Sequence, residues 1–142
     1  MTANTLLAAG TGGARALRAP LATAGVALAA TTYVGLVDPN QSGHYPTCPF
    51  LFITGYYCPG CGSLRAVHAL THGDVGAAVG LNVLTVVGIV AAAVVWGRWM
   101  LRAWRGQPRT RVAPAWTIYL VLGVVVVFWI VRNLTMGEAL AP

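Results

Sequence analysis

Apolar residues gather in three blocks of the chain, and each block is long enough to cross a bilayer as a helix. The blocks cover about residues 19–37, 77–101 and 115–131. A transmembrane helix needs about 17 to 25 residues, because the hydrocarbon core is about 30 Å thick and backbone polar groups in lipid must be bonded within the helix. The pattern therefore predicts an all-α membrane protein with three transmembrane helices.

A stretch of different character, residues 44–74, separates the first two blocks, and we call it the cysteine segment. From Ser63 to His72 no residue opposes a helix, and Ser63 is a candidate cap at its start. Gly73 suits the position just past the helix end, and Asp74 suits the cap of the next helix. The expected fold is three spans with a short amphipathic helix that follows a CPGCG turn.

The remaining organisation is simple. Residues 1–18 are predicted to be a disordered amino-terminal segment, residues 19–134 a single membrane domain and residues 135–142 a tail. The first block also resembles a cleavable secretory signal, because Arg15 and Arg18 precede an apolar run that contains small residues. Its length and the late position of these arginines favour an uncleaved first span.

Composition and charge agree with a membrane protein. The 142 residues are 57% hydrophobic and 8% charged, whereas soluble domains are about 25% charged. Arg15 and Arg18 precede the first block, further arginines crowd the link between the second and third, and the only arginine in residues 38–76 is Arg65. Positive segments stay cytoplasmic. This predicts a cytoplasmic amino terminus and basic loop, with the cysteine segment and the carboxyl terminus outside the cytoplasm.

The net charge of +6 is explained by topology and by anionic headgroups, so it gives no reason to expect nucleic acid binding. The expected partner is the lipid bilayer. Another membrane protein or a second copy of the chain is a further candidate.

The cysteine segment holds all three cysteines, and their spacing permits three kinds of chemistry. The CPGCG motif has the form of a metal knuckle, in which Cys58 and Cys61 would join Cys48 and either His44 or His68 around a zinc ion. The same pair could be a redox-active dithiol, with Arg65 lowering the pKa of the reactive thiol. One structural disulfide with a spare thiol is the third interpretation.

The start of the short helix affects the chemistry. If the helix began near Cys58, its cysteines would share one face with Arg65, His68 and His72, because their spacings of three and four residues follow the helical repeat.

Asn82 lies about two turns into the second apolar block, where a buried amide is costly unless it is bonded. It either faces the cysteine segment or packs against another helix.

These residues resemble a bacterial family of small membrane proteins of unknown function. The resemblance rests on Cys48-Pro49, Thr54-Gly55, CPGCG at 58–62, Arg65-Ala66, Leu70, Gly73-Asp74, Ala77 or Ala78, and Asn82. It implies a location in the bacterial cell membrane and a core built on the cysteine segment, with Arg65, Asp74 and Asn82 as its polar residues. The three histidines lie outside the pattern, and the resemblance supplies no reaction.

The leading functional prediction is a non-catalytic accessory or interaction subunit whose outer segment is fixed by cysteines, through a disulfide or a metal. The alternative is a membrane thiol-disulfide oxidoreductase that uses Cys58 and Cys61. A small transporter or channel component is a third interpretation, supported only by the intramembrane amide.

Overall fold

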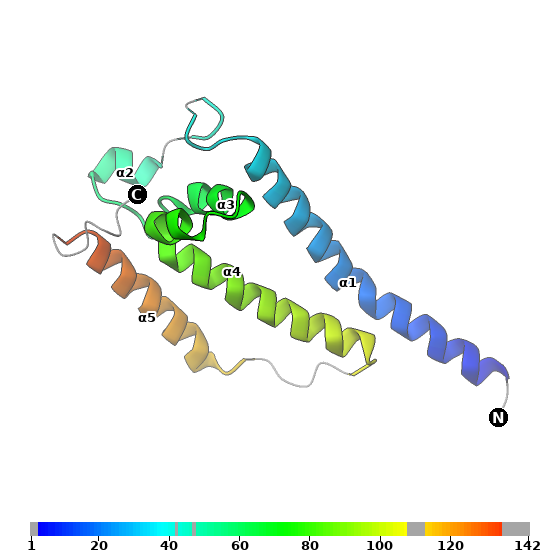
Figure 1. Cartoon of the computed structure of the whole chain (residues 1–142). Coiled ribbons are helices and arrows are strands. Elements are labelled where there is room, and N and C mark those ends of the chain that lie inside the picture. The colour runs from blue at the N-terminus through cyan, green and yellow to red at the C-terminus, as the bar shows by residue number, and fades with distance from the viewer. Residues whose placement is uncertain (1–2, 42, 47, 108–112, 135–142) are drawn as a thin grey trace. The chain divides into compact units, whose positions relative to one another are not determined.

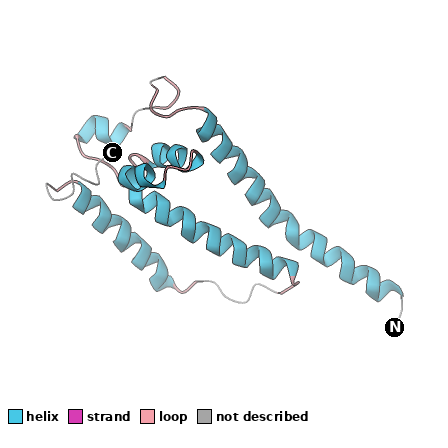
Figure 2. Ribbon diagram, in the orientation of Figure 1, coloured by secondary structure: helices cyan, strands magenta, loops and turns pink. Residues whose placement is uncertain are grey.

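The structure is a computed structural model that describes residues 3–41, 43–46, 48–107 and 113–134, with side chains described from Arg15 onward. It contains five helices, and Figures 1 and 2 show helices and loops without a strand in the described residues. The helices are α1 (Ala3–Leu36), α2 (Pro49–Thr54), α3 (Ser63–Thr71), α4 (Val75–Trp104) and α5 (Ala115–Arg132). The predicted all-α fold is confirmed.

Three of the helices are long and apolar enough to cross a membrane. These candidate spans are Arg15–Leu36, Val75–Trp104 and Ala115–Arg132, which confirms the three predicted spans. The helix α1 begins at Ala3, upstream of the expected span, and thus includes part of the segment for which disorder was predicted. Leucine and alanine are strong helix formers and are common in this segment, which accounts for the early start.

The chain forms two compact units, and each is described separately. The first contains Met1–Ala29 and Val90–Val112, and the second contains Ala30–Ile89 and Ala113–Pro142. In the first unit the indole of Trp96 donates a hydrogen bond of 3.0 Å to the carbonyl of Pro20, which ties α4 to α1. The second unit contains the whole cysteine segment.

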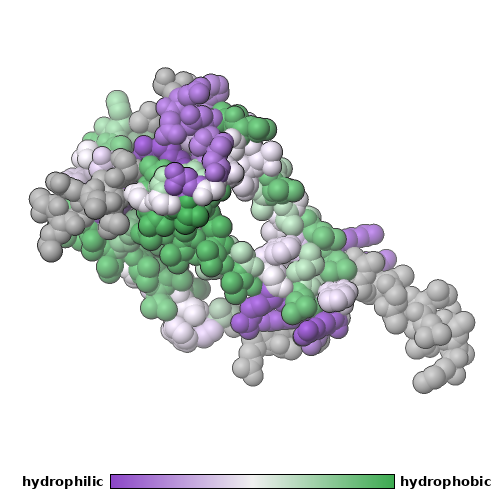
Figure 3. Space-filling model, viewed as in Figure 1, coloured by the Kyte–Doolittle hydropathy of each residue, from purple (hydrophilic) through white to green (hydrophobic). Residues whose placement is uncertain are grey.

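Within the second unit, the end of α1 packs closely on α3. His68 Nδ1 lies 2.8 Å from the carbonyl oxygen of Val34. A Cβ added at Gly35 would come within 3.1 Å of the Thr71 hydroxyl, so only glycine allows this approach without a shift of the neighbour. Figure 3 shows hydrophilic side chains gathered over the turn after α1 and over α3, beside the hydrophobic surface of α4. The α3 end of the cysteine segment is thus fixed to the end of α1.

The boundary between α3 and α4 follows the sequence prediction. Gly73 has a left-handed φ of 79° just past the end of α3, and the Asp74 carboxylate accepts a hydrogen bond of 2.8 Å from the Ala77 N–H. This is the geometry of an N-cap. The predicted cap at Ser63 is wrong, because Gly62 occupies the N-cap position of α3 and no side chain caps that end.

Candidate functional site: a three-cysteine centre

The CPGCG motif forms a turn that ends where α3 begins. The Cys61 N–H donates to the Cys58 carbonyl over 3.1 Å, and the Ser63 N–H donates to the Gly60 carbonyl over 3.1 Å. Gly62 then adopts a φ of 81°, which a residue with a Cβ rarely takes. Because α3 starts at Ser63, a helical face that begins at Cys58 does not form, and that alternative is wrong. The predicted helix after a CPGCG turn is confirmed.

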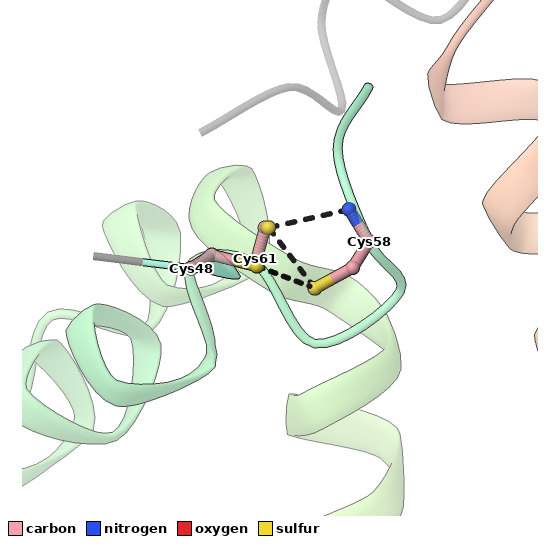
Figure 4. Close-up of side chains that lie close together, drawn as sticks. All are labelled: Cys48, Cys58 and Cys61. Carbon is pink, nitrogen blue, oxygen red and sulfur yellow. Dashed lines mark hydrogen bonds between the residues drawn. The ribbon is translucent and has the colours of Figure 1, made fainter. Parts of the chain in front are cut away.

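The fold brings all three cysteine sulfurs together. Cys58 Sγ lies 3.0 Å from Cys61 Sγ and 3.5 Å from Cys48 Sγ, and the three sulfurs lie within 4.8 Å of one another. Figure 4 shows Cys48 approaching from the start of α2 while the other two come from the turn. Two segments separated in sequence therefore supply one thiol cluster.

The thiols at the two sides of this cluster differ in acidity. A hydrogen bond from the Leu51 backbone lowers the pKa of the Cys48 thiol below its ordinary value, because it stabilises the thiolate. Burial raises the pKa of the Cys61 thiol to about 12. Without a cation, Cys61 therefore stays protonated at neutral pH. A metal would deprotonate it on binding, so metal affinity should increase with pH.

Arg132, at the end of α5, holds the CPGCG turn from the side of the third span. Its side chain is 1% exposed, and Nη1 donates to the carbonyls of Cys58 and Cys61 over 3.2 and 3.1 Å. The guanidinium also lies over the rings of Tyr57 and Phe128 at 5.7 and 5.1 Å. Arg132 and not Arg65 is thus the arginine bonded to the cysteine turn.

Sequence reasoning missed Arg132 because it ends an apolar block and reads as an ordinary flanking residue. One sequence feature could have identified it. In the predicted topology it lies on the outer side, where the positive-inside rule does not account for an arginine.

Asn82 faces the cysteine turn, which is the first of the two alternatives predicted for it. Its side chain is 1% exposed, and Nδ2 donates to the carbonyls of Pro59 and Cys61, each at 3.0 Å. Its Oδ1 accepts the Thr85 N–H at 2.9 Å. Asn82 has φ −165° and ψ 93°, so this extended residue interrupts α4 and caps the helical run that follows. One side chain therefore both starts that run and holds the turn.

Substitution of Asn82 should separate these two roles. We expect Asn82→Ala to lower the free energy of unfolding by about 2 to 4 kcal/mol, because a lost cap costs about 1 kcal/mol and loss of the hydrogen bonds to the Pro59 and Cys61 carbonyls costs a further 1 to 3. Asn82→Ser retains a capping oxygen and should lose about half as much. Unfolding by SDS titration in mild detergent measures both values. Equal losses for the two variants would contradict the capping role.

Asn133 fixes the other side of the turn. It accepts the Tyr57 N–H and donates to the Tyr57 carbonyl, both over 2.9 Å. This pairing imitates a backbone ladder, so the residue before the first CPGCG cysteine is fixed to the end of α5.

The other predicted site residues lie apart from these contacts. Arg65 is half-buried in α3 and makes no hydrogen bond or ion pair with the described part of the chain. His68 Nε2 lies 3.8 Å from Asp38 Oδ1, and His44 is exposed in the turn after α1. In the described residues, the only group of histidine, cysteine or acidic side chains with metal-site spacing is the three cysteines. A histidine fourth ligand and a role for Arg65 beside Cys58 stay predictions.

The structure explains why the motif has small residues at two positions. Ala66 in α3 and Ala78 in α4 are both fully buried, whereas Ala77 is exposed. A larger side chain at either buried position would have no space. Of the two alternatives at 77 and 78, the structure thus identifies Ala78 as the packed residue.

The segment that carries these features matches a known family. Residues 48–96 match the family model described as "Protein of unknown function (DUF2752)". The predicted resemblance to an uncharacterised family is confirmed over these residues. Searches of curated proteins and of solved structures found no match. The family match begins at Cys48 and includes both other cysteines and Asn82, whereas Arg132 lies beyond it.

Proposed function

We propose that this chain is a non-catalytic membrane subunit whose cysteine segment is fixed by a metal ion, with zinc as the candidate, on Cys48, Cys58 and Cys61. The proposal rests on the proximity of the three cysteine sulfurs. Zinc–sulfur bonds of about 2.3 Å in a tetrahedral site separate the sulfurs by about 3.8 Å. The observed separations of 3.0 and 3.5 Å, with all pairs within 4.8 Å, are near that value.

A single disulfide explains the arrangement less well. It uses two of the three sulfurs and gives no reason for the third to approach. A metal ion uses all three sulfurs.

The surroundings of the cluster suit a metal thiolate. Three thiolates around a divalent ion leave one net negative charge, and burial of such a charge is costly. The Arg132 guanidinium, which donates to the carbonyls of Cys58 and Cys61, would offset it. Its hydrogen bonds to the turn carbonyls and those of Asn82 orient the backbone that carries two ligands, as outer-shell contacts do in metal sites.

Hydrogen exchange tests the structural role. We expect a zinc chelator to increase amide exchange in residues 48–62 by tenfold or more in purified protein, because loss of a structural metal unfolds its ligand loop. Exchange in α5 serves as the internal control and should change little. If amide exchange in this segment increased with a reductant but not with the chelator, the segment would be fixed by a disulfide in place of the metal.

The arginine distribution supports a cytoplasmic amino terminus and an extracytoplasmic cysteine segment. The resemblance of the motif implies that the membrane is that of a bacterial cell. A reporter that is active only outside the cytoplasm should work when fused after Pro142. Activity from a fusion at Gln107 would indicate the opposite orientation.

A thiol-disulfide oxidoreductase is the second candidate, and one observation favours it. Cys58 is half-exposed and lies within 3.5 Å of two other thiols. In that reaction Cys58 and Cys61 would form one S–S bond, and the two electrons and two protons released would reduce a disulfide of the substrate to two thiols. The high pKa of Cys61 opposes it, because such a thiol is a poor leaving group when the bond is broken again.

Alkylation rates distinguish the thiols in protein that has been reduced and freed of metal with a chelator. At pH 7 to 8 we expect Cys48 to react with iodoacetamide at least tenfold faster than Cys61, because the lowered pKa gives Cys48 more thiolate and the raised pKa leaves Cys61 protonated. Mass spectrometry of the peptides measures both rates, and protein unfolded in SDS is the control. A Cys61 as reactive as Cys48 would favour the oxidoreductase.

A further inference from the structure

The short helix α2 is fixed to the last turn of α5. The rings of Phe50 and Trp129 meet edge to face at 5.7 Å, and Asn133 pairs with the Tyr57 backbone just beyond α2. Figure 1 shows α2 beside the carboxyl end of α5. If α5 crosses a membrane, these contacts place α2 near the level at which that span leaves the hydrocarbon.

This part of the chain exposes large apolar side chains. Phe52 is 84% exposed and Ile53 is 79% exposed, and Tyr56 is also exposed. At the end of α5, Ile130 and Leu134 are exposed as well. The apolar surface of the span thus continues onto α2. Exposed apolar surface of this kind marks a site of interaction.

The composition of the segment suits lipid better than water. Residues 45–64 contain no acidic, basic or histidine residue, whereas about a quarter of the residues in a soluble domain are charged. The backbone of α2 is also bonded internally. The Phe52 N–H donates to the Cys48 carbonyl at 3.0 Å, and the Gly55 N–H donates to the Leu51 carbonyl at 2.9 Å. These two bonds satisfy part of the α2 backbone without water.

We propose that α2 lies in the interfacial layer of the bilayer, with Phe52 and Ile53 inserted at the boundary between headgroups and acyl chains. Aromatic residues concentrate at this depth, and apolar faces of interfacial helices bury about 5 to 10 Å into it. Trp129 and Tyr56 are the amphipathic side chains expected there. Since Cys48 directly precedes α2, the three-cysteine centre is held at the membrane surface. This inference rests on α5 as a span and is independent of the metal.

Fluorine NMR of the full chain in phospholipid bilayers tests this placement. Trifluoromethyl-phenylalanine is incorporated at position 52, a conservative change that keeps the ring, and in a second sample at position 41, where Gln41 is exposed in the turn after α1. We expect a lipid carrying a nitroxide at acyl carbon 5 to broaden the label at 52 at least threefold more than a water-soluble gadolinium chelate does. The label at 41 should show the reverse.

Two other results would overturn the proposal. Broadening of the position 52 label mainly by the aqueous agent would place α2 in water. Protection from both agents would show that protein, either a partner or a second copy, covers this surface. Zinc content of the same samples reports on the proposed metal separately, so failure of one proposal does not imply failure of the other.

Discussion

Cys48→Ser is expected to lower the zinc affinity of the purified protein by about a hundredfold or more. A tetrahedral zinc site has four ligands, which here would be the three cysteines and one further group. Structural zinc sites contribute about 10 to 16 kcal/mol in total, so one of the four ligands accounts for roughly 2.5 to 4 kcal/mol, and each 1.4 kcal/mol is tenfold in affinity. Competition with a chromogenic chelator at fixed pH measures the change. The fixed pH matters because binding releases protons.

This substitution is the diagnostic one because Cys48 lies outside the CPGCG motif. A site made by Cys58 and Cys61 alone, whether a disulfide or a dithiol, would be unaffected. Tyr56→Phe is the matched control, since Tyr56 is exposed in the same segment and offers no ligand in the cluster. An unchanged affinity in Cys48→Ser, equal to that of the control, would remove Cys48 from the site.

Arg132→Leu is expected to cost about 3 kcal/mol or more in the free energy of unfolding. It removes charge-assisted hydrogen bonds to two carbonyls of the cysteine turn, and such bonds contribute about 1.5 to 3 kcal/mol each. It should also weaken zinc binding, because the positive charge beside the thiolates is lost. SDS titration and chelator competition measure the two effects.

Arg132→Lys retains the charge and should recover most of the zinc affinity while losing part of the stability, since an ammonium lacks the planar fork of a guanidinium. Arg102→Leu is the control for loss of a surface arginine, because Arg102 is exposed near the end of α4. Its effect should stay within about 0.5 kcal/mol. Equal effects at 132 and 102 would contradict the role of Arg132.

The elements of the fold were predictable where local chemistry decides them. Long apolar blocks predict spans, and Gly73 with Asp74 marks the boundary between α3 and α4 through a left-handed turn and a side-chain cap. The break at Asn82 was harder to predict. Asparagine is tolerated within a helix, and the extended conformation becomes favourable because the side chain bonds the turn at 59–61 and the Thr85 N–H together.

The candidate site was predictable in part. The grouping of Cys58 with Cys61 follows from a spacing of three residues, but the approach of Cys48 depends on α2 and the turn at Gly55. Arg132 comes from the far end of the described chain, and no local pattern connects it with the motif. Contacts between distant segments are set by packing. A single sequence therefore indicates which types of residue form such a site more readily than which individual residues do.

X-ray absorption at the zinc edge of wild-type protein, purified in mild detergent without chelator or reductant, tests the central claim most directly. The metal-fixed centre predicts about one zinc per chain with three sulfurs at about 2.3 Å. Protein that holds no zinc and has an intact mass two hydrogens lower, with a disulfide mapped to two of the three cysteines, would contradict it.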